Sequence, residues 1–343
     1  MNKTLLTLCL LACLVAQSRA QGGDPAARAE IEGLNKTVVK LFGERKFEEA
    51  LEPAKRAQSL SEKTFGDRDE LAAVSLNNLA KVYAATGRAG DAEKLYRRAL
   101  SIYEKLFAPD DLRGAPVLDS LGFLAMTVGQ DPDRAAVLFK RALEIRVKAL
   151  GGEHEEVLLT VGNLASAYSA RRDAARVEPL LKYVVEARER TLSAEDPKLL
   201  AALQTYSCFL RQTGRGPEAA RVEERAFSAL AEQAGGGPIM VPSGLALCRV
   251  TAMQIPDFTS RLMSGVTRGG TVRVEVVVDE TGKVVSAKAL DGPTDLRAST
   301  TQAASRTRFA PLLLKGKAVV FSTVLTYTQG PVGRVEDAGG VVR

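Results

Sequence analysis

The sequence predicts an all-α superhelical repeat scaffold of five helix–turn–helix repeats, followed by a small α+β domain with a three-stranded sheet and two helices. Pairs of small residues, seven apart, recur every 42 or 43 residues, and a fixed period of this size indicates stacked helical units. After a stretch rich in glycine and proline at residues 234–247, the apolar pattern changes from helical to alternating. The length of 343 residues fits two domains.

The small residues that define the repeat are here called the ladder residues. Seven residues are two helical turns, so both members of a pair lie on one helix face, where a small side chain lets a second helix approach closely. We therefore expect the ladder residues to face the seams between helices. The five pairs are Ala50 with Ala57, Ala92 with Ala99, Ala135 with Ala142, Val177 with Val184, and Ala219 with Ala226.

Residues 1–20 have the pattern of a secretory signal, with Lys3, an apolar run from Leu5 to Ala16, and Ser18-Arg19-Ala20 as a small-x-small cleavage site. The apolar run is shorter than the ~20 residues that span a bilayer. We expect cleavage and a periplasmic or secreted protein. The alternatives are an uncleaved inner-membrane anchor facing the periplasm, and lipoprotein processing at Cys13. Residues 21–30 form a lead-in.

The charge balance argues against nucleic-acid binding. The whole chain has a net charge of +6. Residues 1–20 carry two basic residues and no acid, so the remainder has 45 basic and 41 acidic residues, or +4. This is a mildly basic surface without the strong positive footprint of a nucleic-acid-binding protein.

Two cysteines, Cys208 and Cys248, remain after the signal. In an exported protein they could form a disulfide between repeat five and the segment that follows it. The simpler interpretation, which we favour from sequence, is two unrelated half-buried thiols.

The repeat region covers residues 31–233, and its second copy is the clearest. Its pattern is Leu76-x-x-Leu79-Ala80-x-x-Tyr83, then Gly87, then Ala92-x-x-x-Tyr96-x-x-Ala99-Leu100. This order of large residues, turn glycine and small residues resembles the tetratricopeptide repeat. The period of about 42 looks like the kinesin-light-chain variety. In copy four, Arg172 replaces the turn glycine. His154, the only histidine, lies in a turn between repeats and is predicted to be a turn or cap residue.

Strand patterns follow the predicted linker at 234–247. Val272 to Val278 alternates, residues 279–283 form a hairpin turn, Val284 to Leu290 is a second strand, Leu296 to Thr307 a helix, and Ala318 to Gln329 a third strand. Residues 330–343 are predicted to be a disordered tail.

Residues 248–329 resemble the C-terminal domain of TonB-type proteins. The matching motifs are Gly270-Thr271-Val272-Arg273-Val274, Val278-Asp279-x-x-Gly282-Lys283-Val284, Arg308-Phe309-x-Pro311 and Gly316-Lys317-x-Val319. The chain departs from that family at Phe258-Thr259, where a Tyr-Pro pair usually opens the first helix. That departure puts receptor recognition by the family's route in doubt.

No pattern in the chain indicates catalysis. A single histidine in a turn makes a catalytic triad improbable, and the chain has no HExxH, CxxC or phosphate-loop motif. We therefore expect no enzyme activity, no cofactor, no metal and no small-molecule substrate.

Two binding surfaces are predicted instead. In the repeat family helix A lines the groove, and asparagines there often bind an extended peptide backbone. The resemblance implies that Asn78 and Asn163 do so, and nearby cations would suit an acidic or carboxylate ligand. These residues could equally be ordinary polar groove residues. The predicted groove residues are Asn78, Lys81, Asn163, Arg171 and Arg211.

The second predicted surface is a sheet edge that accepts a partner strand. TonB-type domains engage a short segment of outer-membrane transporters in this way, and the resemblance implies the same for the third strand. The alternative is that this strand only packs the domain's own helix. The predicted edge residues are Val320, Phe321, Ser322, Thr323, Val324 and Leu325.

These features predict an exported bacterial adaptor that binds a protein or peptide partner, including an outer-membrane transporter or a cell-envelope complex. The alternative is a TonB-type energy transducer that keeps residues 1–20 as a membrane anchor. An enzyme of unrecognised type is the third hypothesis, and no residue supports it.

Overall fold

In the computed structural model, residues 25–233, 237–256, 270–329 and 335–336 are described. The chain forms two compact units, with the boundary between Val177 and Glu178. A helical repeat region followed by a small sheet domain confirms the predicted fold class. The predicted signal, residues 1–20, and the departure at Phe258-Thr259 lie outside the described residues.

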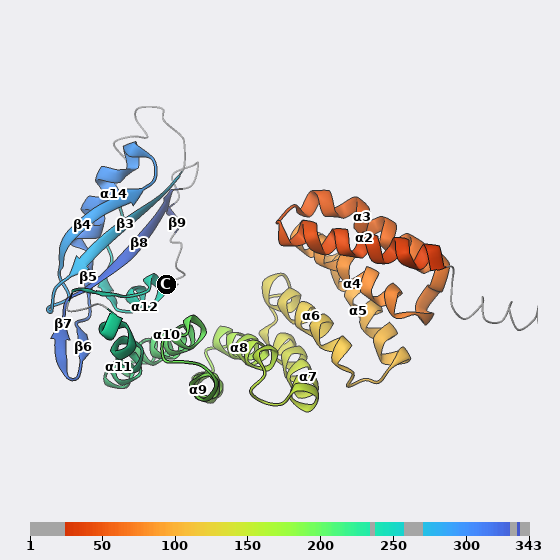
Figure 1. The fold of residues 1–343 in the computed structure, drawn as a ribbon, viewed down its shortest axis with the longest axis horizontal. Coiled ribbons are helices and arrows are strands. Elements are labelled where there is room, and N and C mark those ends of the chain that lie inside the picture. Colours follow the sequence, from red (N-terminus) through yellow and green to blue (C-terminus); the bar gives the residue numbers. More distant parts are fainter. Residues whose placement is uncertain (1–24, 234–236, 257–269, 330–334, 337–343) are drawn as a thin grey trace, which may run out of the picture. The chain divides into compact units, whose positions relative to one another are not determined.

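Unit 1 consists of antiparallel helices joined by short turns (Figure 1). The lead-in predicted for residues 21–30 is wrong from residue 25 onward, because α2 begins at Pro25, and proline is well suited to the first position of a helix. The helices are α2 (Pro25–Gly43), α3 (Phe47–Phe65), α4 (Glu70–Ala85), α5 (Ala89–Leu106), α6 (Ala115–Thr127), α7 (Pro132–Leu150) and α8 (Glu155–Ala170), with α9 (Ala174–Thr191) crossing the boundary.

The ladder residues lie where the sequence predicts, since all eight alanines are completely buried and the two valines nearly so. The helices α6 and α7 also pack closely at Gly122. A Cβ at this position would lie 2.5 Å from Cε1 of Phe139, so the glycine gives the aromatic ring its space. The seams between helices are therefore packing surfaces and not binding surfaces.

The turn inside each repeat contains one residue in the left-handed region, with φ between +47° and +80°. These residues recur with the repeat period and are Arg45, Gly87, Gln130, Arg172 and Gly214. In copy three the position is Gln130 and not the neighbouring Gly129. In three repeats this position is therefore held by a residue with a Cβ, whose backbone is strained in a conformation that suits glycine.

Replacing Arg172 by glycine should stabilise the protein. Arg172 is exposed, and its backbone φ is +57°. Glycine adopts this conformation without the strain that a Cβ causes, so the free energy of unfolding should rise by roughly 1 kcal/mol. Urea unfolding measures the change, and Gly87→Ala is the matched control that should lower stability by a similar amount. A destabilised Arg172→Gly protein would contradict this account.

Cap residues mark the start of several helices. Asp69 accepts a hydrogen bond from the Leu71 amide at 2.9 Å before α4. His154 does the same before α8, because its Nδ1 accepts from the Glu156 amide at 3.3 Å. The prediction that His154 is a turn or cap residue is confirmed.

Unit 2 joins the last repeat to the sheet domain. Its helices are the rest of α9, α10 (Pro197–Gln212) and α11 (Gly216–Gln233), followed by β1 (Ile239–Met240), α12 (Ser243–Leu247) and β2 (Val250–Ala252). Then come β3 (Gly270–Val278), β4 (Val284–Asp291), α14 (Thr294–Arg306), β5 (Arg308–Phe309), β6 (Leu312–Leu314), β7 (Lys317–Val319), β8 (Phe321–Gln329) and β9 (Val335–Glu336).

The main sheet has the strand order β1-β8-β3-β4, with β9 also pairing β8. The strands β3 and β8 are antiparallel, with Val274 opposite Leu325 and Val276 opposite Thr323. Their inward side chains form one apolar core with Phe309 and with Phe227 of α11. The predicted third strand is divided into β7 and β8, and β1 and β9 extend the predicted three strands.

The expected flexible linker at 234–247 is wrong for the part that the structure describes. Ile239 and Val241 are 4% and 1% exposed, and Ala246 is completely buried in the core of the sheet domain. The predicted disordered tail is also wrong at Val335 and Glu336, which form β9. Within the described residues, no helix combines the length and the apolarity that a membrane crossing requires.

Candidate protein-binding surfaces

Asn78, the first predicted groove residue, is buried and already hydrogen-bonded. It is 7% exposed. Its Nδ2 donates to Asn35 Oδ1 at 2.9 Å, and Asn35 Nδ2 donates to Ser75 Oγ at 2.9 Å. These bonds join α2 to α4. They also supply the hydrogen-bond partners that buried side-chain amides require. The prediction that Asn78 binds a peptide backbone is therefore wrong, and its role is structural.

Replacing Asn78 by alanine should destabilise unit 1. The change removes one buried hydrogen bond and leaves Asn35 Oδ1 without its donor, which costs about 1–3 kcal/mol. Urea unfolding checks this, with Asn163→Ala as the control, because Asn163 is half-buried and makes no side-chain hydrogen bond within the described residues. Equal unfolding midpoints for the two variants would contradict the structural role of Asn78.

Lys81 and Asn163 are the predicted groove residues that remain available. Lys81 is half-buried on α4, and burial lowers the pKa of its ammonium group. The described part of the chain offers it no acidic partner. Arg171, by contrast, forms an ion pair with Asp133, so its charge is already balanced. Near Asn163 on α8, Leu159 is 54% exposed, which places an apolar side chain one helical turn before the amide.

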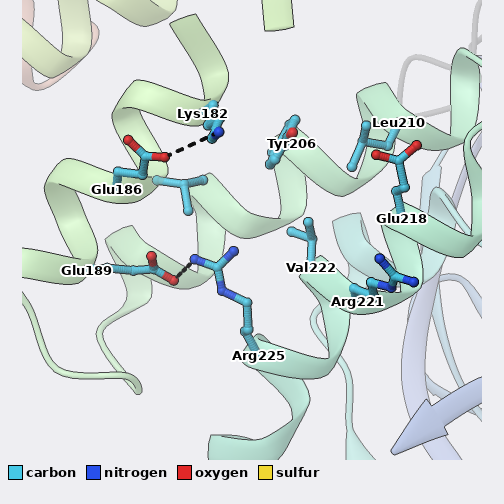
Figure 2. A pocket seen from close by; sticks show the side chains of 10 residues that line it. Lys182, Glu186, Glu189, Tyr206, Leu210, Glu218, Arg221, Val222 and Arg225 are labelled. Carbon is cyan, nitrogen blue, oxygen red and sulfur yellow. Dashed lines mark hydrogen bonds and ion pairs between the residues drawn. The ribbon is translucent and has the colours of Figure 1, made fainter. Parts of the chain in front are cut away.

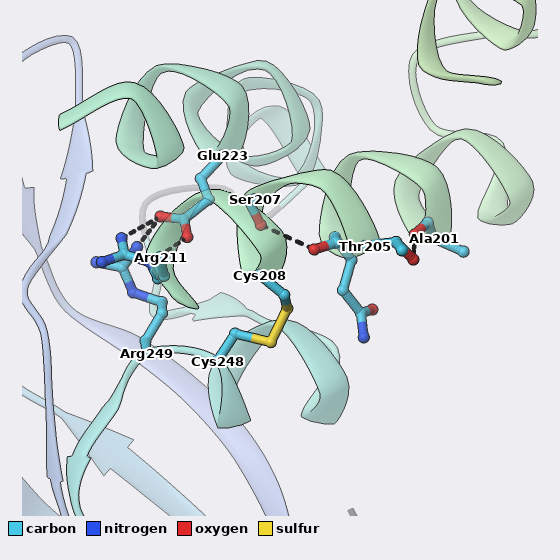
Figure 3. Close-up of a disulfide and its surroundings, with 9 residues drawn as sticks. Ala201, Thr205, Ser207, Cys208, Arg211, Glu223, Cys248 and Arg249 are labelled. Atoms are coloured by element: carbon cyan, nitrogen blue, oxygen red, sulfur yellow. Dashed lines mark hydrogen bonds and ion pairs between the residues drawn. A yellow bond between two sulfur atoms is a disulfide. The ribbon is translucent and has the colours of Figure 1, made fainter. Parts of the chain in front are cut away.

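Arg211 is part of a buried charge cluster and does not line a groove, so this prediction is wrong. Its Nε and Nη2 donate to the two carboxylate oxygens of Glu223, both at 2.7 Å. Glu223 also accepts from Arg249 Nη1 (Figure 3). Arg249 and Glu223 are both almost fully buried. Burial lowers the pKa of Arg249 to about 10, against the opposing effect of the Glu223 carboxylate, so Arg249 stays charged at neutral pH.

Arg249 also holds the sheet domain. Its Nη2 donates to Ala310 O at 3.0 Å and to Pro311 O. The Ala310 amide in turn donates to Arg249 O at 2.7 Å. One side chain therefore joins α11 to the segment between β5 and β6, and this charge cluster fixes the last repeat against the sheet.

Cys208 of α10 and Cys248, just after α12, form a disulfide (Figure 3). Their Cα atoms are 5.2 Å apart, within the usual range. The sequence interpretation of two unrelated thiols is wrong, because the chain folds α12 back against α10. The disulfide and the charge cluster lie side by side in sequence, at residues 248 and 249.

The predicted strand-addition edge is only partly open. β8 pairs with β3 along its whole length, and β1 pairs in parallel with Phe321 and Ser322 on its other side. The side chains of Phe321, Thr323 and Leu325 are completely buried or nearly so. The prediction is therefore wrong for Val320 to Ser322, where β1 already pairs. For Thr323 to Leu325 the main-chain edge stays a prediction, and the core position of the Thr323 and Leu325 side chains fits the alternative that this face packs inside the domain.

A cavity of about 320 Å³ lies among α9, α10 and α11 (Figure 2). Leu210 and Val222 contribute apolar surface. Around them stand three carboxylates and three cations, including the pairs Lys182–Glu186 at 3.7 Å and Arg225–Glu189. The charges balance, so the lining favours neither an anionic nor a cationic ligand.

Two family models match separate parts of the chain. Residues 41–105 match the tetratricopeptide repeat, and residues 266–328 match the Gram-negative bacterial TonB protein C-terminal domain. The repeat region thus has the architecture of tetratricopeptide repeats, which suggests a scaffold for protein–protein interaction. More particularly, the chain joins kinesin-light-chain-like tetratricopeptide repeats to a TonB C-terminal-like domain.

Similar proteins share the repeat region. The Arabidopsis thaliana protein KINESIN LIGHT CHAIN-RELATED 2 is 25% identical over 169 residues, which are 49% of this chain and 25% of that protein. The chain therefore matches only about a quarter of this relative's length. A putative kinesin light chain from Podosopora anserina with nearly identical repeats has a TM-score of 0.54 at 23% identity, covering 60% of this chain and 97% of that one. BtubC from P. vanneervenii has a TM-score of 0.51 at 18% identity, covering 63% and 95%. These two structures support the fold alone.

Proposed function

We propose that this protein is an exported, non-catalytic adaptor that binds a partner peptide on the helix A surface of unit 1. The observation that carries this proposal is the pair of unused polar groups there. Lys81 keeps a cation in a half-buried place without an acidic partner among the described residues. Burying a charge without a partner is costly, and an acidic peptide group would remove that cost.

The disulfide supports export. Disulfides persist in oxidising compartments and are rare where thiols are kept reduced. Together with the signal-like pattern of residues 1–20, this favours the periplasm or the cell exterior. The alternative, a TonB-type energy transducer with an inner-membrane anchor, is favoured by the TonB C-terminal match. N-terminal sequencing separates the two, because a mature chain that starts at Gln21 has lost the proposed anchor.

Partner capture tests the groove. The affinity-tagged whole chain and its Lys81→Ala/Asn163→Ala variant are compared for recovery of crosslinked proteins from the producing cells. We expect the variant to lose one or more specific partners while it remains folded. Arg172→Ala, which changes an exposed turn residue, is the control and should retain them. Unchanged recovery by the folded double variant would remove support for this surface.

The second proposed surface is the outer edge of β8. An extended partner segment would pair its main chain with the strand, and its side chains would provide specificity. The TonB C-terminal match supports this mode of binding. The partner proposed for this surface is an outer-membrane transporter or another protein of the cell envelope.

A further inference from the structure

Two hydrogen bonds show which backbone groups of β8 face outward. The Val241 amide donates to Ser322 O at 2.8 Å, and the Ile239 amide donates to Val320 O at 3.5 Å. Backbone groups of alternate residues in a strand face the same side. The N–H and C=O groups of Ser322, Val324 and Thr326 therefore face away from β3, on the side where β1 pairs.

Residues 239–247, here called the latch segment, lie along this side of β8. β1 is parallel to β8, and α12 follows at once and also contacts β8. At the other end of β8, β9 pairs with Thr328 and Gln329. Between these two short strands, no described strand pairs with the outward groups of Val324 and Thr326. A partner strand longer than a few residues must displace one of the two.

The latch segment is firmly held where it ends. Cys248 is bonded to Cys208 of α10, and Arg249 is bonded to Glu223 of α11. Release of β1 is therefore a local event that leaves the last repeat and the sheet domain joined. Because the segment stays attached, it returns to β8 at a high effective concentration, against which a free peptide must compete.

We propose that the latch segment is an internal competitor for the partner strand. This proposal rests on the proposed strand-addition function of β8. β1 occupies the place where a parallel partner strand would begin. The Ile239 and Val241 amides of the latch segment already use the Val320 and Ser322 carbonyl groups. The partner is an extended peptide that displaces β1 and continues along Val324 and Thr326.

The latch segment also indicates the chemistry of that partner. Ile239 and Val241 are buried in the core, while Met240 between them is 52% exposed. A competing strand therefore needs an apolar-x-apolar pattern. Ile239 also lines an open cavity of about 560 Å³ together with Leu314 and Val319. This space accommodates an apolar side chain larger than isoleucine at the first of the two positions.

Proline substitutions in the latch segment test the proposal. Val241→Pro removes the amide that donates to Ser322 O. Met240→Pro is the matched control. Met240 lies between Ile239 and Val241, whose amides donate to β8, so the Met240 amide faces away from β8 and its loss removes no bond to that strand. The probe is a synthetic peptide with the sequence of residues 237–243, and its binding to the whole oxidised chain is measured by fluorescence anisotropy. We expect Val241→Pro to bind it at least about tenfold more tightly than wild type and Met240→Pro.

A second measurement fixes the site and separates the two levels of the proposal. Adding Val324→Pro to Val241→Pro should abolish peptide binding, because it removes an outward-facing amide to which the peptide would pair. The Val324 amide makes no hydrogen bond to β3, so the pairing of β8 with β3 is kept. Hydrogen exchange reports whether the Ser322 amide, which lies opposite β1, becomes accessible in Val241→Pro. Unchanged exchange and unchanged binding would overturn the latch alone. Faster exchange without tighter peptide binding would overturn the strand-addition function on which it rests. Equal gains in Val241→Pro and Met240→Pro would also overturn the latch.

Discussion

Replacing Glu223 by alanine should destabilise unit 2 by about 3–5 kcal/mol, because it leaves two buried or half-buried guanidinium groups without their carboxylate. Glu223 is 1% exposed and accepts hydrogen bonds from both Arg211 and Arg249. Arg249 would keep only its carbonyl acceptors at Ala310 and Pro311. The Arg249 side chain also binds the sheet domain through Ala310 and Pro311. We therefore expect α11 and the sheet to unfold in separate transitions in the variant.

Denaturant unfolding of the whole chain, followed by far-ultraviolet circular dichroism, measures this loss. Glu218→Ala is the matched control on the same helix, because Glu218 is half-exposed and pairs with Arg215 at the surface. An exposed ion pair is worth at most about 1 kcal/mol. If Glu223→Ala and Glu218→Ala unfold at the same denaturant concentration, the charge cluster does not hold the two parts of unit 2 together.

Replacing Ala142 by leucine should destabilise unit 1 by about 1–3 kcal/mol. Ala142 is a ladder residue on α7 and is completely buried. Extra methyl groups in a closely packed seam force side chains out of their rotamers or move the backbone. Ala142 shares a buried cluster with Ala115 and Leu118 of α6, so the larger side chain should disturb the packing of α6 against α7.

The same helix contains the control for this experiment. Ala149 lies two helical turns after Ala142 and is exposed, so Ala149→Leu should change the free energy of unfolding by no more than about 0.5 kcal/mol. The difference between the two variants isolates the effect of the seam from the helix propensity of leucine. Equal stability of Ala142→Leu and Ala149→Leu would contradict the packing role of the ladder residues.

The periodic part of the structure could be predicted from the sequence because each repeat places its small residues by the same rule. The ladder residues and the cap role of His154 follow from local pattern alone. The alternating valines of β3 likewise predict their burial. Such patterns depend on contacts that recur within every repeat or strand.

The junction between the last repeat and the sheet could not be predicted in this way, because its contacts join residues far apart in sequence and occur once. Arg249 meets carbonyl groups about sixty residues away. One signal was present, since Glu223 lies between the ladder residues Ala219 and Ala226 on the buried face of α11. A carboxylate on such a face predicts a buried cationic partner, although not which one.

The groove predictions failed for a related reason. Asn78 and Arg211 have the residue types of a binding surface, but both are used inside the protein, by Asn35 and Glu223 respectively. Residue type and repeat position indicate which groups a side chain is able to bind. They do not indicate whether a neighbouring residue of the same protein already occupies that side chain. Lys81 and Asn163 remain candidates because the described neighbours leave them available.

Site-specific photocrosslinking in the producing cells tests the central claim most directly. A photoreactive amino acid at position 163 would lie on the proposed binding surface, and one at position 149 on an exposed part of α7 in the same unit. We predict discrete protein adducts from position 163 that are absent from position 149 and are reduced by Lys81→Glu. Adducts that are the same from both positions, or none from position 163, would contradict the claim that this repeat surface binds a protein partner.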